Sequence, residues 1–134
     1  MSASDYLELE VLDHVLGKGT RDFPSPTTLA VALFTVMPND DGTGGTEVAN
    51  LYDYARQSAT FATASAGSSS TSADLTYGPA NGGAFGTIVG VGIYDNATYG
   101  AGDPLIFATL AVDKTVSDGD TFVISSGNLT VNLD

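Results

Sequence analysis

The pattern of apolar and polar residues at the start of the chain is helical. Between Ser4 and Leu16 the apolar residues recur every three or four positions, which puts them on one side of a helix. Ser4 or Asp5 can serve as the N-cap, and Gly17 suits the C-terminal end. The apolar arc is wide for so short a helix, so we expect it to pack on the protein's own sheets or on a neighbouring subunit. The apolar residues of this arc are Leu9, Leu12 and Leu16, with Val11 and Val15 beside them.

Beyond residue 20 the apolar pattern changes to the period of two that is typical of strands. Turn residues separate the apolar runs, and a serine- and glycine-rich segment, residues 65–72, is interpreted as a hinge. In one predicted strand Gly90 and Gly92 leave a face bare, so that another part of the protein can approach the backbone closely. The predicted strands are Leu29–Val36, Tyr54–Thr63, Ala73–Tyr77, Thr87–Tyr94, Leu105–Val112, Thr121–Ser125 and Leu129–Leu133.

These features predict an all-β fold. We expect an antiparallel β-sandwich, jelly-roll-like, of about seven to eight strands with one short N-terminal helix. No helices alternate with the strands, which argues against a parallel sheet. We divide the chain into an N-terminal helix and arm, residues 1–19, and a β-sandwich domain, residues 20–134.

The charge of the chain narrows the possible partners. Its net charge is −12, and only four residues are basic. Binding to nucleic acid or to an anionic membrane is therefore disfavoured, since both depend on lysine and arginine. The acidity favours solubility, with docking onto a basic surface or cation binding as alternatives. The start of the chain lacks the features of a signal peptide and no segment has the length of a transmembrane helix, so we expect a soluble protein made in the cytoplasm.

The residue types that carry catalysis show no convergent pattern. His14 is the only histidine and falls at the edge of the apolar side of the predicted helix, with no nucleophile motif around any serine. The acidic loop from Asn39 to Glu47 resembles a calcium loop only faintly, because Glu47 is misplaced and no helices flank the loop. The chain has no cysteine, which excludes disulfides and thiolate metal sites. We therefore predict no enzyme activity, no cofactor and no metal site, with a weak cation site of this loop at a subunit junction as the alternative.

Two other features bear on recognition. Arg56 is the one interior strand position with a permanent charge, and we expect it to pair with an acid or to reach into a neighbouring subunit. The chain has many tyrosines and no tryptophan, which suits ordinary sheet faces, with a sugar-binding platform as the alternative. These tyrosines are Tyr52, Tyr54, Tyr77, Tyr94 and Tyr99.

An ordered set of short segments covers nearly the whole chain and resembles a known group of proteins. The segments are Tyr6-Leu7, Leu12–Gly17, Leu29–Phe34, Gly44–Val48, Tyr54–Gln57, Val91–Asp95, Lys114–Val116, Gly119–Phe122 and Asn128–Val131. In this order the chain is similar to small structural proteins of tailed phages and prophages that are often labelled tail fibre proteins. The resemblance implies a virion component, and it transfers no catalytic or ligand-binding residue.

We predict a non-enzymatic structural protein of a tailed-phage virion. The chain is compact and acidic and has neither a repeat nor a coiled coil, which favours a capsid decoration or cement protein on the outer head lattice. Its expected partners are the major capsid protein or other virion proteins and further copies of itself, with a trimer favoured. The alternative is a tail fibre or tail-associated module that recognises the host surface; a small glycan hydrolase is the weakest hypothesis. The candidate partner-binding residues are Leu9, Leu12, Leu16, Phe23 and Arg56.

Overall fold

The computed structural model describes residues 2–18 and 25–133. Within these residues the chain forms one helix and ten strands, nearly all of them short. In chain order they are β1 (Ser2–Ala3), α1 (Asp5–Leu16), β2 (Leu29–Val36), β3 (Thr46–Glu47), β4 (Gln57–Ala59), β5 (Ser68–Ser70), β6 (Leu75–Tyr77), β7 (Gly86–Tyr94), β8 (Pro104–Val116), β9 (Phe122–Ile124) and β10 (Thr130–Asn132).

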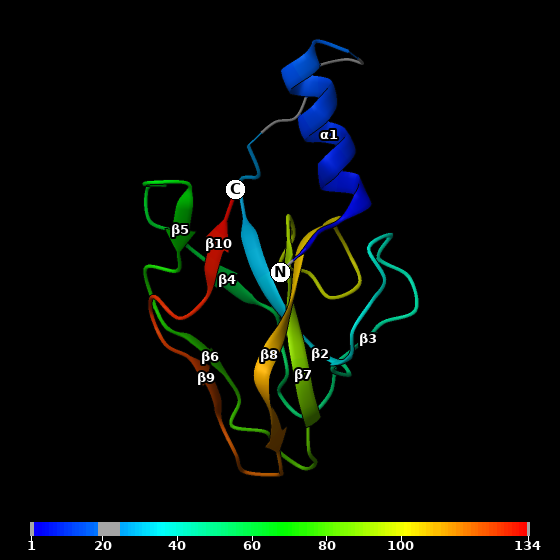
Figure 1. Cartoon of the computed structure of the whole chain (residues 1–134). Coiled ribbons are helices and arrows are strands. Elements are labelled where there is room, and N and C mark those ends of the chain that lie inside the picture. The colour runs from blue at the N-terminus through cyan, green and yellow to red at the C-terminus, as the bar shows by residue number, and fades with distance from the viewer. Residues whose placement is uncertain (1, 19–24, 134) are drawn as a thin grey trace.

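The strands form two layers, and every strand pair is antiparallel (Figure 1). One layer is a six-stranded sheet in the order β1-β8-β7-β2-β3, with β4 also paired to β2. The other layer consists of two strand pairs, β10-β5 and β6-β9. The predicted all-β sandwich with one short N-terminal helix is therefore confirmed.

The predicted strands differ from the observed ones where the apolar pattern is weak. The predicted strand Leu29–Val36 coincides with β2, whereas the predicted strand Tyr54–Thr63 shrinks to β4. The prediction of a hinge at residues 65–72 is wrong in part, because β5 lies inside this segment and pairs with β10. Three consecutive serines carry no apolar period, so this strand depends on its partner rather than on its own sequence.

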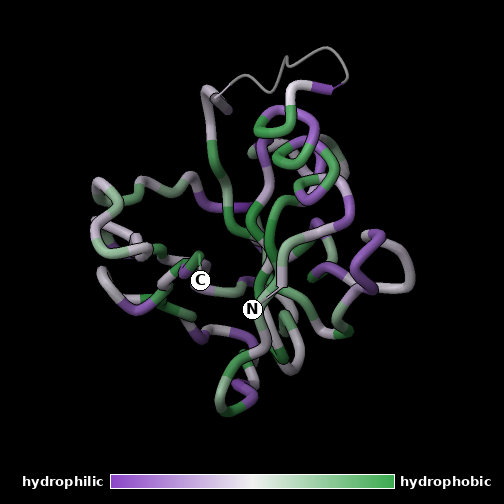
Figure 2. The backbone as a smooth tube through the Cα atoms, turned by 45° about the horizontal axis from the view of Figure 1, so that its top comes forward, coloured by the Kyte–Doolittle hydropathy of each residue, from purple (hydrophilic) through white to green (hydrophobic). Residues whose placement is uncertain are grey.

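The main core lies between the two layers. Val31, Leu33 and Ile88 of the large sheet are completely buried, and they meet Leu75 and Phe122 from the opposite layer. Figure 2 shows hydrophobic stretches of the chain converging where the layers meet. Side chains from alternating positions of both layers thus fill one interior, as in other sandwiches.

A smaller apolar cluster covers the other face of the large sheet, and it accounts for the two strand glycines. Phe34 and Phe107 pack there at right angles, with ring centroids 6.0 Å apart. A Cβ atom at Gly92 would lie 2.8 Å from the Phe34 ring, and one at Gly90 would lie 2.2 Å from the sulfur of Met37. The expected close approach to these glycines is confirmed: it is made by aromatic and methionine side chains of the same chain.

Two tyrosine hydroxyls complete the hydrogen bonding of β2 where its partner strands leave a gap. On this edge β4 pairs with β2 up to Val31, and β3 pairs with it from Phe34 onward. Between them the Tyr77 hydroxyl donates to the Val31 carbonyl oxygen at 2.9 Å, and the Leu33 N–H donates to the Tyr54 hydroxyl at 3.0 Å. Buried backbone groups need such partners, so these tyrosines replace part of a missing strand.

The two buried tyrosines make the stability of the fold sensitive to alkaline pH. Burial raises the pKa of both Tyr54 and Tyr77 far above the ordinary value near 10. Above about pH 10 the folded state therefore binds more protons than the unfolded state, and stability falls as pH rises, by about 1.4 kcal/mol per pH unit for each tyrosine. Below about pH 10 this contribution is fully present.

We expect urea unfolding midpoints to be constant between about pH 7 and 9 and to fall steeply above pH 10. The tyrosinate absorbance that comes from Tyr54 and Tyr77, measured as the difference from a variant with phenylalanine at both positions, should appear together with the loss of the circular dichroism of the fold, because these two tyrosines ionise only when it opens. A variant with phenylalanine at both positions should lose much of this alkaline slope. A slope equal to that of the original chain would show that other groups cause it.

Candidate functional site

Helix α1 projects from one end of the sandwich (Figure 1). Ser4 caps it, since its hydroxyl accepts a hydrogen bond from the Leu7 N–H at 3.3 Å, and Gly17 ends it with a left-handed φ of 68°. The predicted helix and both of its end signals are confirmed.

The first turn fixes the helix to the body. Ser4 is buried, and its N–H donates to the Leu105 carbonyl oxygen of β8 at 2.9 Å. Just before it, β1 pairs with β8, and the half-buried side chains of Tyr6 and Leu7 pack against the main core. The attachment is therefore a short strand and one helical turn, and the rest of the helix extends beyond it.

The later turns of α1 expose their apolar side. None of the helix residues is buried, and Leu9, Leu12 and Leu16 are 63%, 54% and 67% exposed. Val11 and Val15 on the adjoining side are exposed as well. An uncovered apolar side of this kind on a protein of this size usually marks an interaction surface. Of the two expected packing partners, the protein's own sheets contact only the base of the helix within the described residues.

Acidic residues border this apolar side. On a helical projection Glu8 and Asp13 flank the line of Leu9, Leu12 and Leu16. No ion-pair partner lies within 4.0 Å of either carboxylate in the part of the chain that the structure describes. We name the surface formed by Leu9, Leu12, Val15 and Leu16 with these two acids the helix face. Its composition suits an apolar site that carries positive charge.

Arg56 lies in the interior and is paired. Its guanidinium forms a bidentate ion pair with Glu47, with Nε–Oε1 and Nη2–Oε2 distances of 2.9 and 2.8 Å. Nη1 donates to the carbonyl oxygens of Ala101 and Asn96, and the group lies 4.0 Å from the centre of the Tyr94 ring. The expectation that Arg56 pairs with an acid is confirmed within the subunit.

The environment of Arg56 stabilises its charged form. Burial alone would lower the pKa of Arg56, but the hydrogen bonds and the charge of Glu47 outweigh burial and raise it. Because Glu47 and two carbonyl oxygens occupy most of its donors, and because only 2% of the side chain is exposed, Arg56 serves the interior of this subunit. Its predicted role in partner binding stays a prediction.

The acidic loop before β3 is held by its own hydrogen bonds. Asp41 accepts hydrogen bonds from the hydroxyl and the N–H of Thr43 at 2.7 and 2.9 Å, and these bonds lower the pKa of its carboxyl group. Glu47, which the sequence places near a calcium-like loop, points to Arg56 instead. Among the described residues no group of three or more potential ligands is close enough to hold a metal ion.

A hollow of about 500 Å³ lies at the end of the sandwich opposite α1. It is bordered by Asp53 and Asp118. The Asn81 amide donates to Asp53 and the Gly82 N–H donates to Asp118, so both carboxylates have structural partners. The tyrosines do not gather at one surface: Tyr54 and Tyr77 are buried, whereas Tyr52 and Tyr99 are partly exposed.

A second uncovered apolar surface lies between the two layers. β8 carries a large bulge, because Gly90 pairs with Thr109 and Ile88 with Lys114, so that residues 110–113 lie opposite the single residue Val89. Bulges of this kind re-aim side chains, and Val112 is 65% exposed. The result is a groove of about 370 Å³, here called the β8–β9 groove. It is lined by Leu110, Ala111, Val112, Lys114, Phe122, Val123, Ile124 and Asn128.

Comparison with known families decides what kind of protein this is. A family model described as "Podophage GP4 fiber I protein gp80" matches residues 2–132, nearly the full length of the chain. The chain belongs to this family. It is a family of fibre-like structural proteins of tailed-phage virions, and the resemblance found in the sequence is confirmed. Among proteins with curated descriptions, none matches the sequence.

The structure places the candidate partner-binding residues in different parts of the molecule. Leu9, Leu12 and Leu16 are brought together on the helix face, whereas Arg56 lies apart from them in the interior. Phe23 lies outside the described residues. His14 is exposed on α1, at the edge of the apolar side, as expected for a helix-boundary residue. No helix of the described chain is long and apolar enough to span a membrane.

Sequence reasoning missed the β8–β9 groove. The period-two pattern indicated a strand that ends at Val112, whereas β8 continues to Val116 with the bulge in its middle. The available signal was the run Leu110-Ala111-Val112, in which neighbouring apolar residues break the alternation of a strand that has one wet face.

Proposed function

We propose that this chain is a structural subunit of a podophage fibre, held among its neighbours in the virion through the helix face. The family match over residues 2–132 carries the proposal. It favours the fibre alternative over the capsid decoration predicted from compactness and charge. The uncovered helix face supports the proposal, since a subunit of an assembly needs a surface that is complete only in contact with another protein.

Imaging of intact particles tests the location. Gold-labelled antibodies against the purified chain should bind particles of a phage that encodes it at the tail or its fibres. Antibody absorbed beforehand with the purified chain is the control and should leave the particles unlabelled. Label spread over the whole head would overturn the fibre proposal and would establish a decoration protein.

A further inference from the structure

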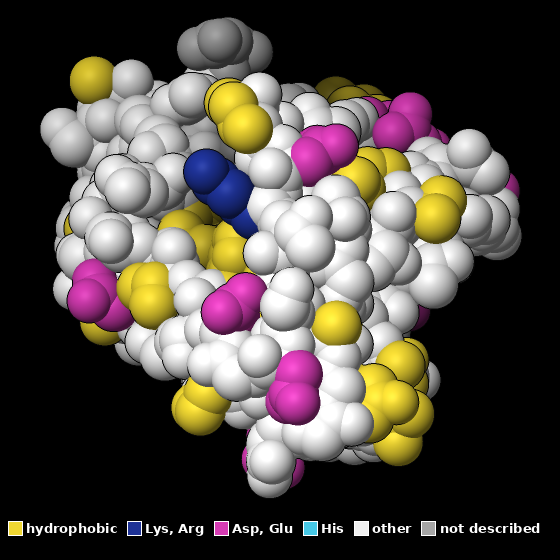
Figure 3. Space-filling view, turned by 90° about the horizontal axis from the view of Figure 1, so that it is seen from below, with side chains coloured by type: hydrophobic (Ala, Val, Ile, Leu, Met, Phe, Trp, Pro, Cys, Tyr) yellow, Lys and Arg dark blue, Asp and Glu magenta, His cyan; other side chains and the backbone are white. Residues whose placement is uncertain are grey.

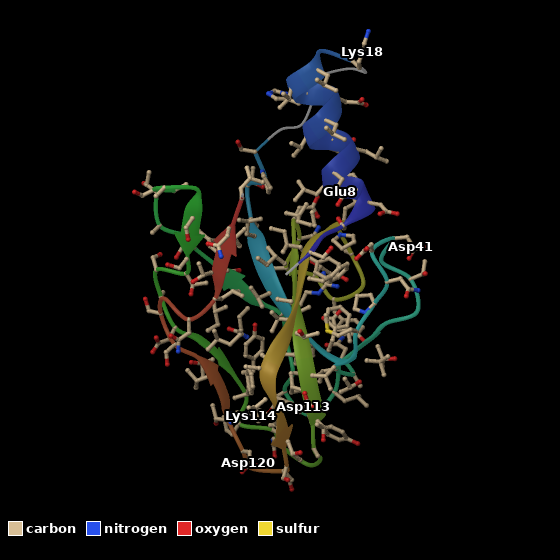
Figure 4. The ribbon with its side chains drawn as sticks, in the orientation of Figure 1. Glu8, Lys18, Asp41, Asp113, Lys114 and Asp120 are labelled. Carbon is tan, nitrogen blue, oxygen red and sulfur yellow. The ribbon has the colours of Figure 1, made fainter. Side chains whose placement is uncertain are left out.

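The helix face and the β8–β9 groove are two separate surfaces. Helix α1 forms one end of the molecule, whereas Lys114, which lines the groove, lies toward the other end (Figure 4). Figure 3 looks at that second end and shows a basic side chain beside a hollow floored by hydrophobic side chains. The lining of the β8–β9 groove is apolar apart from Lys114 and Asn128.

The charges of the two surfaces are complementary. Lys114 is exposed and is the one charged residue in the lining of the groove, since the neighbouring Asp113 does not line it. No carboxylate lies within 4.0 Å of the Lys114 ammonium group in the described residues. The helix face carries Glu8 and Asp13, which also lack an ion-pair partner there. The groove and the helix face are therefore complementary: apolar side chains can pack on apolar side chains, and Lys114 can pair with Glu8 or Asp13.

Two turns of α1 carry the helix face. From Leu9 to Leu16 the helix rises about 10 Å, at 1.5 Å per residue. The β8–β9 groove has a volume of about 370 Å³, and amphipathic helices are commonly bound in apolar grooves of other proteins.

Pairing of two helix faces with each other is disfavoured. In a parallel pair Glu8 of one copy would face Asp13 of the other, because residues five positions apart flank the seam on opposite sides. In an antiparallel pair each acid would face its own counterpart. Both arrangements bring like charges together beside an apolar seam, which opposes association.

We propose that the helix face of one copy docks in the β8–β9 groove of a second copy, so that the subunits stack head to tail. A contact between two different surfaces is heterologous, and it builds an open filament unless the rotation between successive copies closes a ring. The occupant of the groove is thus a second copy of this chain. This contact would be the one that holds neighbouring subunits together in the fibre, so it rests on the proposed fibre role. The test below uses the purified chain alone and does not depend on where the protein lies in the virion.

The absence of cysteine allows a direct test. Leu12 and Val112, on the helix face and in the groove, are replaced by cysteine in one chain and treated with a short flexible bis-maleimide. We expect a ladder of covalent dimers, trimers and larger species on a denaturing gel. A mixture of the Leu12→Cys and Val112→Cys single variants should stop at the dimer, because each copy then has only one reactive surface.

Two further variants make the outcome decisive. Ala73→Cys, at an exposed position outside both surfaces, should give no dimer when mixed with Leu12→Cys. Lys114→Glu in the double-cysteine chain should abolish the ladder, since it places an acid opposite the acids of the helix. Efficient cross-linking of Leu12→Cys to itself would overturn the proposal in favour of helix pairing. If cross-linking does not exceed that of the Ala73→Cys control, the proposal is overturned, even if imaging places the protein on fibres.

Discussion

Replacing Arg56 by methionine should lower the free energy of unfolding by about 3–5 kcal/mol, the usual cost of removing one partner from a buried ion pair. The change leaves the Glu47 carboxylate, whose side chain is only 11% exposed, without the two hydrogen bonds that now neutralise it. It also removes the donors of the carbonyl oxygens of Asn96 and Ala101. Urea unfolding followed by circular dichroism measures the difference.

Lys18→Met is the matched control, because Lys18 is an exposed cation at the end of α1; its expected effect is within about 0.5 kcal/mol. A double variant, Arg56→Met with Glu47→Leu, should recover part of the loss, because it removes the unpaired charge together with its partner. If Arg56→Met unfolds no more easily than Lys18→Met, the ion pair contributes nothing to the fold.

The sequence predicts best the elements whose own residues determine them. Helix α1 has caps at both ends, and seven of the eight residues of β2 are apolar, Thr35 being the exception. Both were therefore predicted within a residue of their observed bounds. The three serines of β5 form a strand because β10 pairs with them, and a pairing partner far along the chain leaves no local signal.

The candidate site shows the same division. The apolar side of α1 and the need of Arg56 for an acid follow from residue type and period. The identity of that acid does not, because Glu47 lies in a two-residue strand after a long loop and reaches Arg56 only in the folded chain. The β8–β9 groove depends on a register shift between β7 and β8, and registers are set by the whole sheet rather than by one strand.

Replacing both Tyr54 and Tyr77 by phenylalanine should also destabilise the fold strongly. Each hydroxyl makes a buried hydrogen bond with the backbone of β2, and loss of a buried bond partner costs about 1–3 kcal/mol. The rings and their packing remain, including the stacked arrangement of the two rings with centroids 6.3 Å apart. We therefore expect the urea midpoint to fall while the circular dichroism spectrum of the folded state stays the same.

Tyr99→Phe is the matched control, because Tyr99 is partly exposed and packs edge-on against the Tyr54 ring. It should change stability by no more than about 0.5 kcal/mol. The Tyr54 hydroxyl also donates to Glu47 at 2.9 Å, so Tyr54→Phe and Arg56→Met remove donors from the same carboxylate. Their effects should not add, whereas those of Tyr77→Phe and Arg56→Met should add within about 0.5 kcal/mol. Strict additivity of Tyr54→Phe with Arg56→Met would show that the gap in β2 and the ion pair are independent, and that Glu47 does not link them.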